Sequence, residues 1–270
     1  MMPLIVHLGC GPAGLEWAKV AGLTQKVCPG VSVSAGNLTI SDPMVLSAYL
    51  YTTVPYWPEG SVFLAKPEKM GSARLVAVRL TGGSLIVSPD DGTSTLCAQN
   101  MGIVEAYEID PDIFGSDDYA IVRCGAQLSA GLPLAEVGPA LSPADVYQFD
   151  VPESHIEEGL AEGAVFMLLK TFGNLTFTIS IDEFESAGFK TGDLLKVTFT
   201  REGKVEYQEE MTFQPSFGYV PEGDPVIFNG SSGYLDIGLN KKSFIDEALP
   251  QVLEAENPLD FKVRIERVQS

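Results

Sequence analysis

The stretch from residue 3 to residue 28, PLIVHLGCGPAGLEWAKVAGLTQKVC, limits what this chain can fold into more than any other. An apolar run ends in a cluster of glycines, and the residues after the cluster carry apolar side chains at helical spacing. A strand, a tight turn and a helix together form a basic unit of an α/β sheet, because the helix packs back on the strand. We therefore expect an α/β domain in this part of the chain.

Gly9, Gly11 and Gly14 match the G-x-G-x-x-G pattern of turns that bind a dinucleotide pyrophosphate at a helix N-terminus. That fingerprint also requires an acid about 20 residues further on, where the second strand ends and the ribose is bound. Here the second predicted strand, 31–34, runs into Ala35-Gly36-Asn37, which contains no acid. Glycines also mark any sharp strand-to-helix turn, so we favour a structural turn over a flavin or nicotinamide site.

The charge balance argues against nucleic-acid partners. The chain has 17 lysines and arginines against 36 aspartates and glutamates, a formal net charge of −19. Affinity for nucleic acid comes largely from Lys and Arg side chains that neutralise phosphates. The apolar runs are all shorter than the roughly 20 residues of a membrane span, and the N-terminal residues do not resemble a secretory signal. We expect neither a nucleic acid nor a membrane as a partner.

The cysteines and histidines point away from metal chemistry. The four cysteines, at positions 10, 28, 97 and 124, are scattered without C-x-x-C spacing, and the chain has two histidines. A protein zinc site needs clustered thiolates, imidazoles or carboxylates. We predict no metal site, buried reduced thiols and a cytoplasmic protein.

Helices and strands keep alternating after the first unit. The pattern predicts helices at 44–51 and 93–99, a helix within 115–131 capped by Ser116 or Asp117, and strands at 61–65, 74–80, 84–88 and 103–109. The helix at 44–51 follows Ser41-Asp42-Pro43, a capping side chain with proline in the first turn. The loop 66–73 leads to Arg74 and is a candidate functional loop, since loops on a rigid scaffold often carry chemistry.

The second half of the chain has a different pattern. Residues 139–160 predict a linker between an N-terminal domain, 1–138, and a C-terminal domain, 161–270. Short strands are predicted at 163–170, 175–181, 194–200, 205–213, 225–230, 233–238 and 261–268. The predicted fold class is therefore an α/β domain, a central sheet flanked by helices, followed by a small β-barrel.

Several sequence phrases occur in an order typical of one enzyme family. PEGSVF (58–63), SPDDG (88–92) and AGLPLAEVG (130–138) precede Phe172-Gly173-Asn174 and NGSSGYL (229–235). Essentially from end to end, the chain resembles the S-adenosylmethionine (SAM) hydroxide adenosyltransferases and their fluorinase and chlorinase relatives. The resemblance implies a homotrimer with SAM bound at the subunit interface, between one subunit's N-terminal domain and a neighbour's barrel, and no cofactor besides this adenosyl ligand.

The implied reaction is displacement at the ribose C5′, in which water or halide attacks and the sulfur of methionine leaves. In the hydrolase branch an Asp, an Arg and a His surround the attacking water. Arg74 matches the Arg, Lys66 stands at the Asp position, and 114–118 contains no histidine at the His position. Asp117 falls where a serine contacts halide in the fluorinase branch. Because a carboxylate repels halide and accepts a proton from water, we predict Arg74 and Asp117 as catalytic residues and disfavour halogenation.

The resemblance also supplies candidate binding residues. His7 falls at the first-strand Asp that binds the ribose diol, although a neutral imidazole offers one acceptor where a carboxylate offers two oxygens. Lys66 would lie beside the substrate. Asn174 and Asn240 are implied at the adenine edge, and Ser231 and Ser232 at the methionine end. Each residue also fits an ordinary turn or barrel-rim position.

Two functions of different classes therefore remain. The first is a divergent SAM-binding protein that, if active, hydrolyses SAM to adenosine and methionine. The second is a catalytically inactive trimeric binding or structural protein of the same fold, because the Asp and His positions have changed. The flavin or nicotinamide enzyme is a third, weaker alternative.

Overall fold

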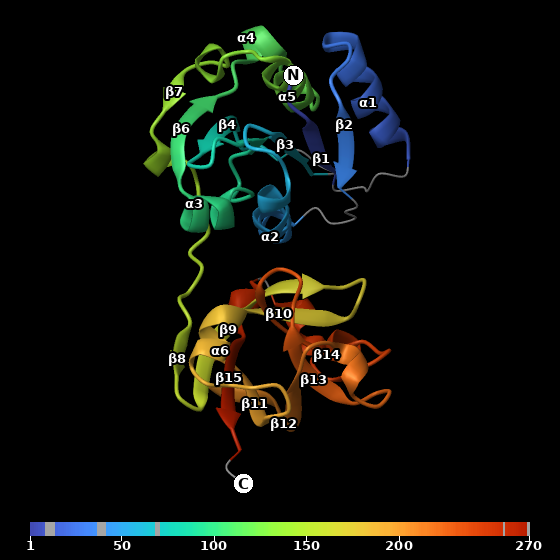
Figure 1. Ribbon diagram of the computed structural model, residues 1–270, viewed down its shortest axis with the longest axis vertical. Helices are drawn as coiled ribbons and strands as arrows, with labels where there is room; N and C mark the ends of the chain where they lie inside the picture. The colour runs from blue at the N-terminus through green and yellow to red at the C-terminus, as the bar shows by residue number, and fades with distance from the viewer. Residues whose placement is uncertain (9–13, 37–41, 68–70, 256, 269–270) are drawn as a thin grey trace. The chain divides into compact units, whose positions relative to one another are not determined.

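The computed structural model describes residues 1–8, 14–36, 42–67, 71–255 and 257–268 (Figure 1). The chain forms two compact units, Met1–Phe149 and Asp150–Ser270. Their boundary falls within the stretch 139–160 that the sequence predicted as a linker. The first unit extends past residue 138 because the short strand β7 (Ala140–Leu141) pairs with the edge strand of its sheet.

The first unit is built on a mixed sheet with the strand order β2-β1-β3-β5-β4-β6-β7. Strands β1, β2, β3 and β5 run parallel, and β4 is antiparallel to both of its neighbours. The other strands are β1 (Leu4–Leu8), β2 (Val33–Gly36), β3 (Val62–Lys66), β4 (Leu75–Leu80), β5 (Leu85–Pro89) and β6 (Ile103–Glu108). The alternation predicted from the sequence is confirmed.

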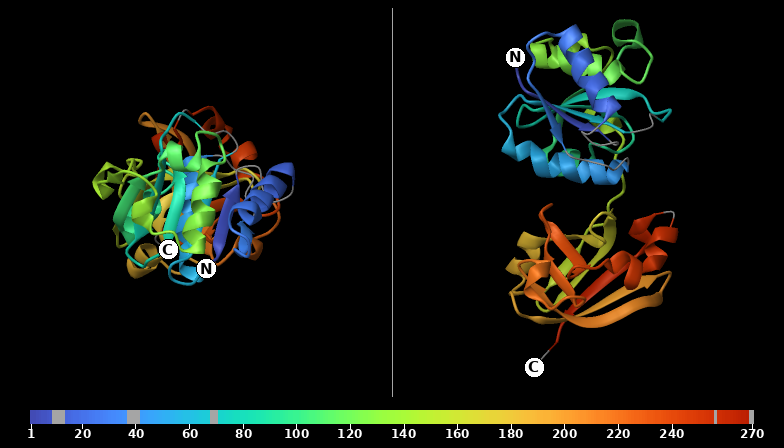
Figure 2. Two further views of the ribbon diagram at one scale, coloured as in Figure 1. Left: turned by 90° about the horizontal axis from the view of Figure 1, so that it is seen from above. Right: turned by 90° about the vertical axis from the view of Figure 1, so that its right-hand side faces the viewer.

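Helices cover both faces of this sheet (Figures 1 and 2). Helices α1 (Leu15–Val27) and α5 (Ala120–Ala130) pack on one face, and α2 (Pro43–Thr53) and α3 (Thr95–Met101) pack on the other. The short helix α4 (Pro111–Phe114) precedes α5. Alternate strand residues serve the two cores: Val6 and Leu8 face α1 and α5, whereas Ile5 faces α2 and α3. Both faces of the central strands are therefore buried, which explains their nearly continuous apolar sequences.

Helix α2 begins where the sequence predicted a helix start. The Asp42 carboxylate accepts hydrogen bonds from the backbone N–H groups of Met44 and Val45, at 2.9 and 3.2 Å, and Pro43 occupies the first turn. These contacts satisfy donors that would otherwise be unpaired at the helix N-terminus.

The strand order reverses between β1 and β3. The connection through α1 places β2 on one side of β1, and the connection through α2 then crosses to place β3 on the other side. From the paired carboxyl ends of β1 and β3, the chain therefore continues to β2 on one side and to β4 and β5 on the other. Such a topological switch point is where open α/β sheets bind ligands.

The second unit is a closed barrel with one extra edge strand. Its sheet order is β10-β14-β13-β12-β11-β15-β9-β8, and an additional pairing of β10 with β9 closes it. The strands are β8 (His155–Glu157), β9 (Leu160–Leu169), β10 (Asn174–Ser180), β11 (Leu194–Arg201), β12 (Lys204–Gln214), β13 (Pro225–Asn229), β14 (Tyr234–Leu239) and β15 (Lys262–Arg267). The predicted fold class, α/β followed by a β-barrel, is confirmed.

Aromatic side chains fill the barrel core. The rings of Phe184 and Phe189 stack with centroids 3.9 Å apart, and the Phe213 ring meets Phe184 edge-on at 5.2 Å. Phe184 comes from the short helix α6 (Ile181–Ser186). The short helix α7 (Phe244–Glu247) contributes Phe244 to the same core.

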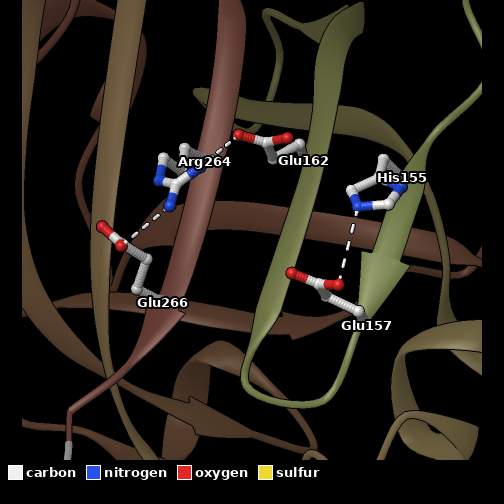
Figure 3. A network of polar contacts seen from close by, with 5 residues as sticks. All are labelled: His155, Glu157, Glu162, Arg264 and Glu266. Carbon is white, nitrogen blue, oxygen red and sulfur yellow. Dashed lines mark hydrogen bonds and ion pairs between the residues drawn. The ribbon is translucent and has the colours of Figure 1, made fainter.

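Charged side chains line the outer face of β8, β9 and β15 (Figure 3). Arg264 pairs with Glu162 across the strands and with Glu266 at 3.1 Å, while His155 and Glu157 lie 3.9 Å apart. Exposed pairs of this kind each contribute about 0–1 kcal/mol. This face is therefore a solvated surface of the barrel.

The turn between β9 and β10 generates a stability prediction. Gly173 has a φ of 72°, and a Cβ there would lie 2.4 Å from the Ser243 Cα, whereas Gly203 has a φ of 77° and open space around it. We expect Gly203→Ala to cost about 1 kcal/mol through its backbone conformation alone. Gly173→Ala should cost about 3 kcal/mol because it also collides with backbone. Urea unfolding measures both, and equal costs would contradict the packing argument.

Candidate functional site

Two of the predicted substrate-binding residues lie at the carboxyl ends of β1 and β3. His7 is in register with Ala65, and Leu8 is in register with Lys66. Because strand side chains alternate, His7 shares the face of Ile5, toward α2 and α3, and Lys66 shares the face of Leu8, toward α1 and α5. The structure thus brings the two residues to one edge of the sheet but on opposite faces.

His7 is a buried histidine with unmet hydrogen-bonding capacity. Its residue surface is 2% exposed, and neither Nδ1 nor Nε2 has a partner in the part of the chain that the structure describes. Burial lowers the pKa of the imidazole to about 4, so the ring is neutral near pH 7. A neutral imidazole carries one donor and one acceptor. His7 therefore has the chemistry of a residue that a polar ligand group would complete.

Gly36 explains why β2 ends without an acid. A Cβ at Gly36 would lie 2.3 Å from the Nδ1 of His7, which is in register with it. Any side chain at this position would collide with the imidazole. An acid at position 36, where β2 ends, would therefore collide with the buried side chain of His7. The glycine motif itself, apart from Gly14, lies outside the described residues.

Lys66 has an acidic partner that the sequence did not reveal. Its side chain is 4% exposed, its Nζ lies 3.1 Å from the Glu16 Oε1, and the same ammonium lies 5.5 Å from the centre of the Tyr119 ring. The Tyr119 hydroxyl donates to the other carboxylate oxygen of Glu16, Oε2, at 3.0 Å. The Nζ of Lys19 lies 3.5 Å from the same oxygen. The Lys66 charge at the switch point is therefore neutralised.

The electrostatics of Glu16 agree with this pairing. Burial by itself raises the pKa of the Glu16 carboxyl, but the hydrogen bonds from Lys66 and Tyr119 and the charges of Lys66 and Lys19 outweigh it. The net result is a lowered pKa. Glu16 is therefore ionised at neutral pH and balances the ammonium beside it.

Arg74 is also matched by an acid. Its Nε donates to the Asp90 Oδ2 at 2.8 Å, and its Nη2 donates to the Asp145 carbonyl at 2.7 Å. The Asp90 backbone N–H donates back to the Arg74 carbonyl, which places Arg74 beside the carboxyl end of β5. A predicted catalytic cation thus lies at the same edge of the sheet as His7 and Lys66, held in a fixed orientation.

Asp117 is used locally. Its carboxylate accepts hydrogen bonds from the Tyr119 N–H at 2.8 Å and the Arg123 guanidinium at 2.7 Å, and its side chain is 63% exposed. The hydrogen bond from Arg123 and then that from the Tyr119 backbone lower the pKa of this carboxyl. A lowered pKa makes a weaker base. The geometry shows a residue that orders the entry to α5, and its predicted role as a base stays untested.

The barrel brings Asn174 and Asn240 to one end of β14. The Asn174 side chain lies across Gly238, where a Cβ would be 2.4 Å from its Oδ1. Asn240 follows two residues later, and its Nδ2 donates to the Val220 carbonyl at 2.7 Å. Both side chains are buried at the same rim. Their predicted contact with an adenine edge stays a prediction.

Ser231 and Ser232 lie at the other end of β14. They occupy a turn closed by hydrogen bonds from the Gly230 N–H to the Tyr234 carbonyl and from the Gly233 N–H to the Gly230 carbonyl. The Ser232 hydroxyl is buried and has no partner in the described residues, while Ser231 is exposed. Along a strand of about 3.3 Å per residue, this turn is roughly 20 Å from Asn174. A single molecule that contacts both ends must lie along β14.

Sequence reasoning missed three buried or partly buried groups. Glu16 was read only as part of a helix, and its pairing with Lys66 depends on tertiary packing. Ser88 is the penultimate residue of β5 and has a buried hydroxyl without a partner in the described residues; the phrase SPDDG includes this serine but does not indicate that its hydroxyl is buried and unpaired. Asp236 lies in the middle of β14, where an acid between two core residues, Leu235 and Ile237, was the available signal.

Asp236 has an unusual environment for a carboxyl group. It is buried, and its Oδ1 accepts a hydrogen bond from the Thr176 hydroxyl at 2.6 Å. Burial raises its pKa to about 7, and the bond from Thr176 opposes this only in part. The Asp236 carboxyl group therefore changes its charge near neutral pH, well above the range of an ordinary aspartate.

The remaining predictions concern metals, thiols and membranes. Among the described residues, no group of three or more His, Cys, Asp or Glu side chains is arranged to hold a metal ion. Cys28, Cys97 and Cys124 are free thiols whose pKa burial raises, to about 12 for Cys97, while Cys10 lies outside the described part of the chain. In the described ranges, no helix has the length and apolar character of a membrane span.

A doubly covered sheet with buried polar side chains at its switch point is the framework of a small-molecule-binding α/β protein. Residues 17–138 match the SAM hydroxide adenosyltransferase N-terminal domain, and residues 169–251 match the C-terminal domain of the same family. The chain belongs to the SAM hydroxide adenosyltransferase family. The suspected resemblance is confirmed.

The relatives of this chain carry two enzyme names. A fluorinase of Actinopolyspora mzabensis is 28% identical over 264 residues, covering 84% of this chain and 86% of that protein. An (R)-S-adenosyl-L-methionine hydrolase of Salinispora tropica is 28% identical over 207 residues, covering 72% of each. The chain is thus similar to enzymes of both names at moderate identity.

Solved structures support the fold. The crystal structure of an uncharacterized conserved protein from Thermotoga maritima superposes with a TM-score of 0.79 at 20% identity, covering 98% of this chain and all of that one. A conserved hypothetical protein from Thermus thermophilus gives 0.72 at 24% identity. At these identities the likeness concerns the fold alone.

The buried imidazole predicts a pH dependence of stability. The His7 pKa is about 4 in the folded state against 6.5 as the ordinary value, so below pH 6.5 the unfolded chain takes up a proton that the folded chain refuses. Stability is therefore lost as the pH falls from 6.5 to 4, by about 3 kcal/mol from this group. In His7→Asn that loss should be absent. Urea unfolding between pH 7 and 4 measures it.

The control is His155→Asn, which alters the exposed histidine on β8. Its stability should follow the wild type across the same pH range. A His7→Asn curve that also runs parallel to the wild type would contradict a buried neutral imidazole.

Proposed function

We propose that this chain binds SAM and hydrolyses it to adenosine and methionine. Water attacks the ribose C5′, the new C5′–O bond forms as the C5′–S bond breaks, and one proton passes to solvent. The sulfonium leaves as a neutral thioether and needs no acid. Family membership and the similar hydrolases support this proposal.

One observation carries the proposal for this divergent chain. Both predicted cations at the edge of the sheet are matched by an acid, Lys66 by Glu16 at 3.1 Å and Arg74 by Asp90 at 2.8 Å. Unmatched, a lysine at the position of the hydrolase Asp would repel a sulfonium. Because each charge is balanced within the same unit, the site remains compatible with a cationic substrate.

In this proposal His7 binds the ribose. Its imidazole is neutral, buried and without a partner in the described residues, so a ribose hydroxyl would satisfy groups that each cost about 1–3 kcal/mol when unpaired. Asn174 and Asn240 would bind the adenine edge, and Ser231 and Ser232 the methionine end. The proposal does not depend on Asp117 as a base.

The assembly and location are also proposals. A homotrimer with the ligand at the subunit interface would join residues from the first unit of one chain with the barrel of another. Sedimentation velocity tests this part. A cytoplasmic location agrees with the free thiols of Cys28, Cys97 and Cys124, and no cofactor is needed because the sulfonium is already an activated leaving group.

A catalytically inactive binding protein of the same fold is the second candidate. Its support is the exposed, ion-paired Asp117 together with the lysine at the position of the hydrolase Asp. Halide transfer has less support, because an ionised carboxylate at Asp117 repels halide. Incubation with SAM, with and without fluoride or chloride, followed by chromatography, separates the three outcomes.

Release of adenosine and methionine above a protein-free control is the expected result. Binding of SAM without turnover would select the inactive protein, a 5′-halogenated product would select halide transfer, and absence of both binding and turnover would overturn the proposal.

Arg74 gives the matched test. Its guanidinium lies at the edge that carries the site, so Arg74→Ala should lower kcat about a hundredfold, as loss of a preorganised charge does in other enzymes. Arg79→Ala is the control, because Arg79 is 33% exposed against 35% for Arg74 and has its own acid, Glu105, at 2.9 Å. Arg79 lies toward the opposite end of β4, so its variant should keep full activity. Equal losses in both would contradict the assignment.

A further inference from the structure

Asp236 lies midway between the two groups of barrel residues that would hold the ends of the ligand. Residues 234, 236, 238 and 240 share one face of β14, since Leu235 and Ile237 point into the barrel core. Asn174 reaches across Gly238 on one side of Asp236, and the turn with Ser231 and Ser232 lies on the other side. A ligand that extends along β14 between these ends passes the Asp236 carboxyl group.

The contacts of Asp236 leave its charge without a cationic partner. On β10 it faces Thr176, whose hydroxyl donates at 2.6 Å, and on β13 it is in register with Phe228. On the turn it faces Gly230, where a Cβ would lie 2.7 Å from Oδ1. These neighbours are uncharged, and no ion pair of Asp236 occurs in the described residues. In contrast, Lys66 and Arg74 already have acids of their own.

A merely structural role explains little of this arrangement. Burying a carboxyl group without a cation costs free energy, whereas a serine or threonine would satisfy the Thr176 hydroxyl at lower cost. A buried acid that lacks a counter-charge is typical of a site whose cation arrives with the ligand. The middle of an extended SAM molecule carries such a cation, its sulfonium.

We propose that Asp236 is a specificity-determining residue whose carboxylate stabilises the sulfonium of SAM and so favours this ligand over neutral adenosyl thioethers. The inference rests on the proposed function, because it assumes that an adenosyl ligand lies along β14. It adds an electrostatic reason for selectivity that the paired residues Lys66 and Arg74 do not supply.

Two ligands isolate the charge. SAM and S-adenosylhomocysteine share the adenosine and amino-acid parts and differ by one methyl group and the sulfonium charge. Titration calorimetry with each, at pH 6 and pH 8, gives the ratio of their affinities, and comparing this ratio between the wild type and Asp236→Asn removes the contribution of the ligands' own amino groups. Because the proposed reaction consumes SAM, chromatography of the cell contents measures how much SAM remains intact, and the affinity is calculated from that amount.

The wild type should prefer SAM about tenfold more strongly at pH 8 than at pH 6, because Asp236 is largely protonated at the lower pH. In Asp236→Asn, whose side chain still accepts from Thr176, the preference at pH 8 should fall about tenfold and lose its pH dependence. Glu210→Gln removes an equal charge at an exposed position of β12. It should change neither the preference for SAM at pH 8 nor the pH dependence of that preference.

The outcomes separate the two levels of proposal. An affinity ratio that is the same in the wild type and Asp236→Asn, at both pH values, would overturn the role of Asp236 while leaving SAM binding intact. Failure of the wild type to bind either ligand would overturn the proposed function, and with it this inference. Asp236→Glu, which keeps the charge, should retain part of the preference and so distinguish charge from packing.

Discussion

The reversal of strand order between β1 and β3 is the constraint on which the first unit of this protein depends. Helices α1 and α2 pack on opposite faces of the sheet, and β1 and β3 pair in parallel, so the carboxyl ends of β1 and β3 lie side by side at one edge. Polar side chains are tolerated at this edge because the strands end there. This feature places His7 and Lys66, and Arg74 lies at the same edge beside the carboxyl end of β5.

Charge compensation is the second organising principle. Taking a lysine out of water costs several kcal/mol unless it is paired, and Lys66 is almost wholly buried. Glu16 of α1 and Tyr119, just before α5, contact it, so two segments far apart in sequence meet at this ammonium. The barrel shows the opposite arrangement at Asp236, a buried carboxyl whose neighbours are uncharged. This contrast between paired Lys66 and unpaired Asp236 supports the proposal that Asp236 is the counter-charge of a cationic ligand.

Much of the fold followed from local patterns, and the site followed only in part. The capping of α2 by Asp42 and the strands of the barrel were predictable because they depend on short-range spacing. The resemblance identified His7, Lys66 and Arg74 as candidate site residues, and the structure brings them to one edge of the sheet. It gave no indication that Lys66 faces Glu16 or that Asp117 pairs with Arg123, since such partners depend on how α1 and α5 pack.

The sequence by itself determined the fold class, the family and the positions at which the chain departs from it, because periodicity, turn residues and ordered motifs are written in local composition. The tertiary structure alone decided what those departures mean. It showed that Gly36 is required by the imidazole of His7, that Lys66 is neutralised, and that Asp236 is buried without a cation. The physical reason is that burial and charge pairing depend on groups from distant segments, and their energies are set only when those segments pack together.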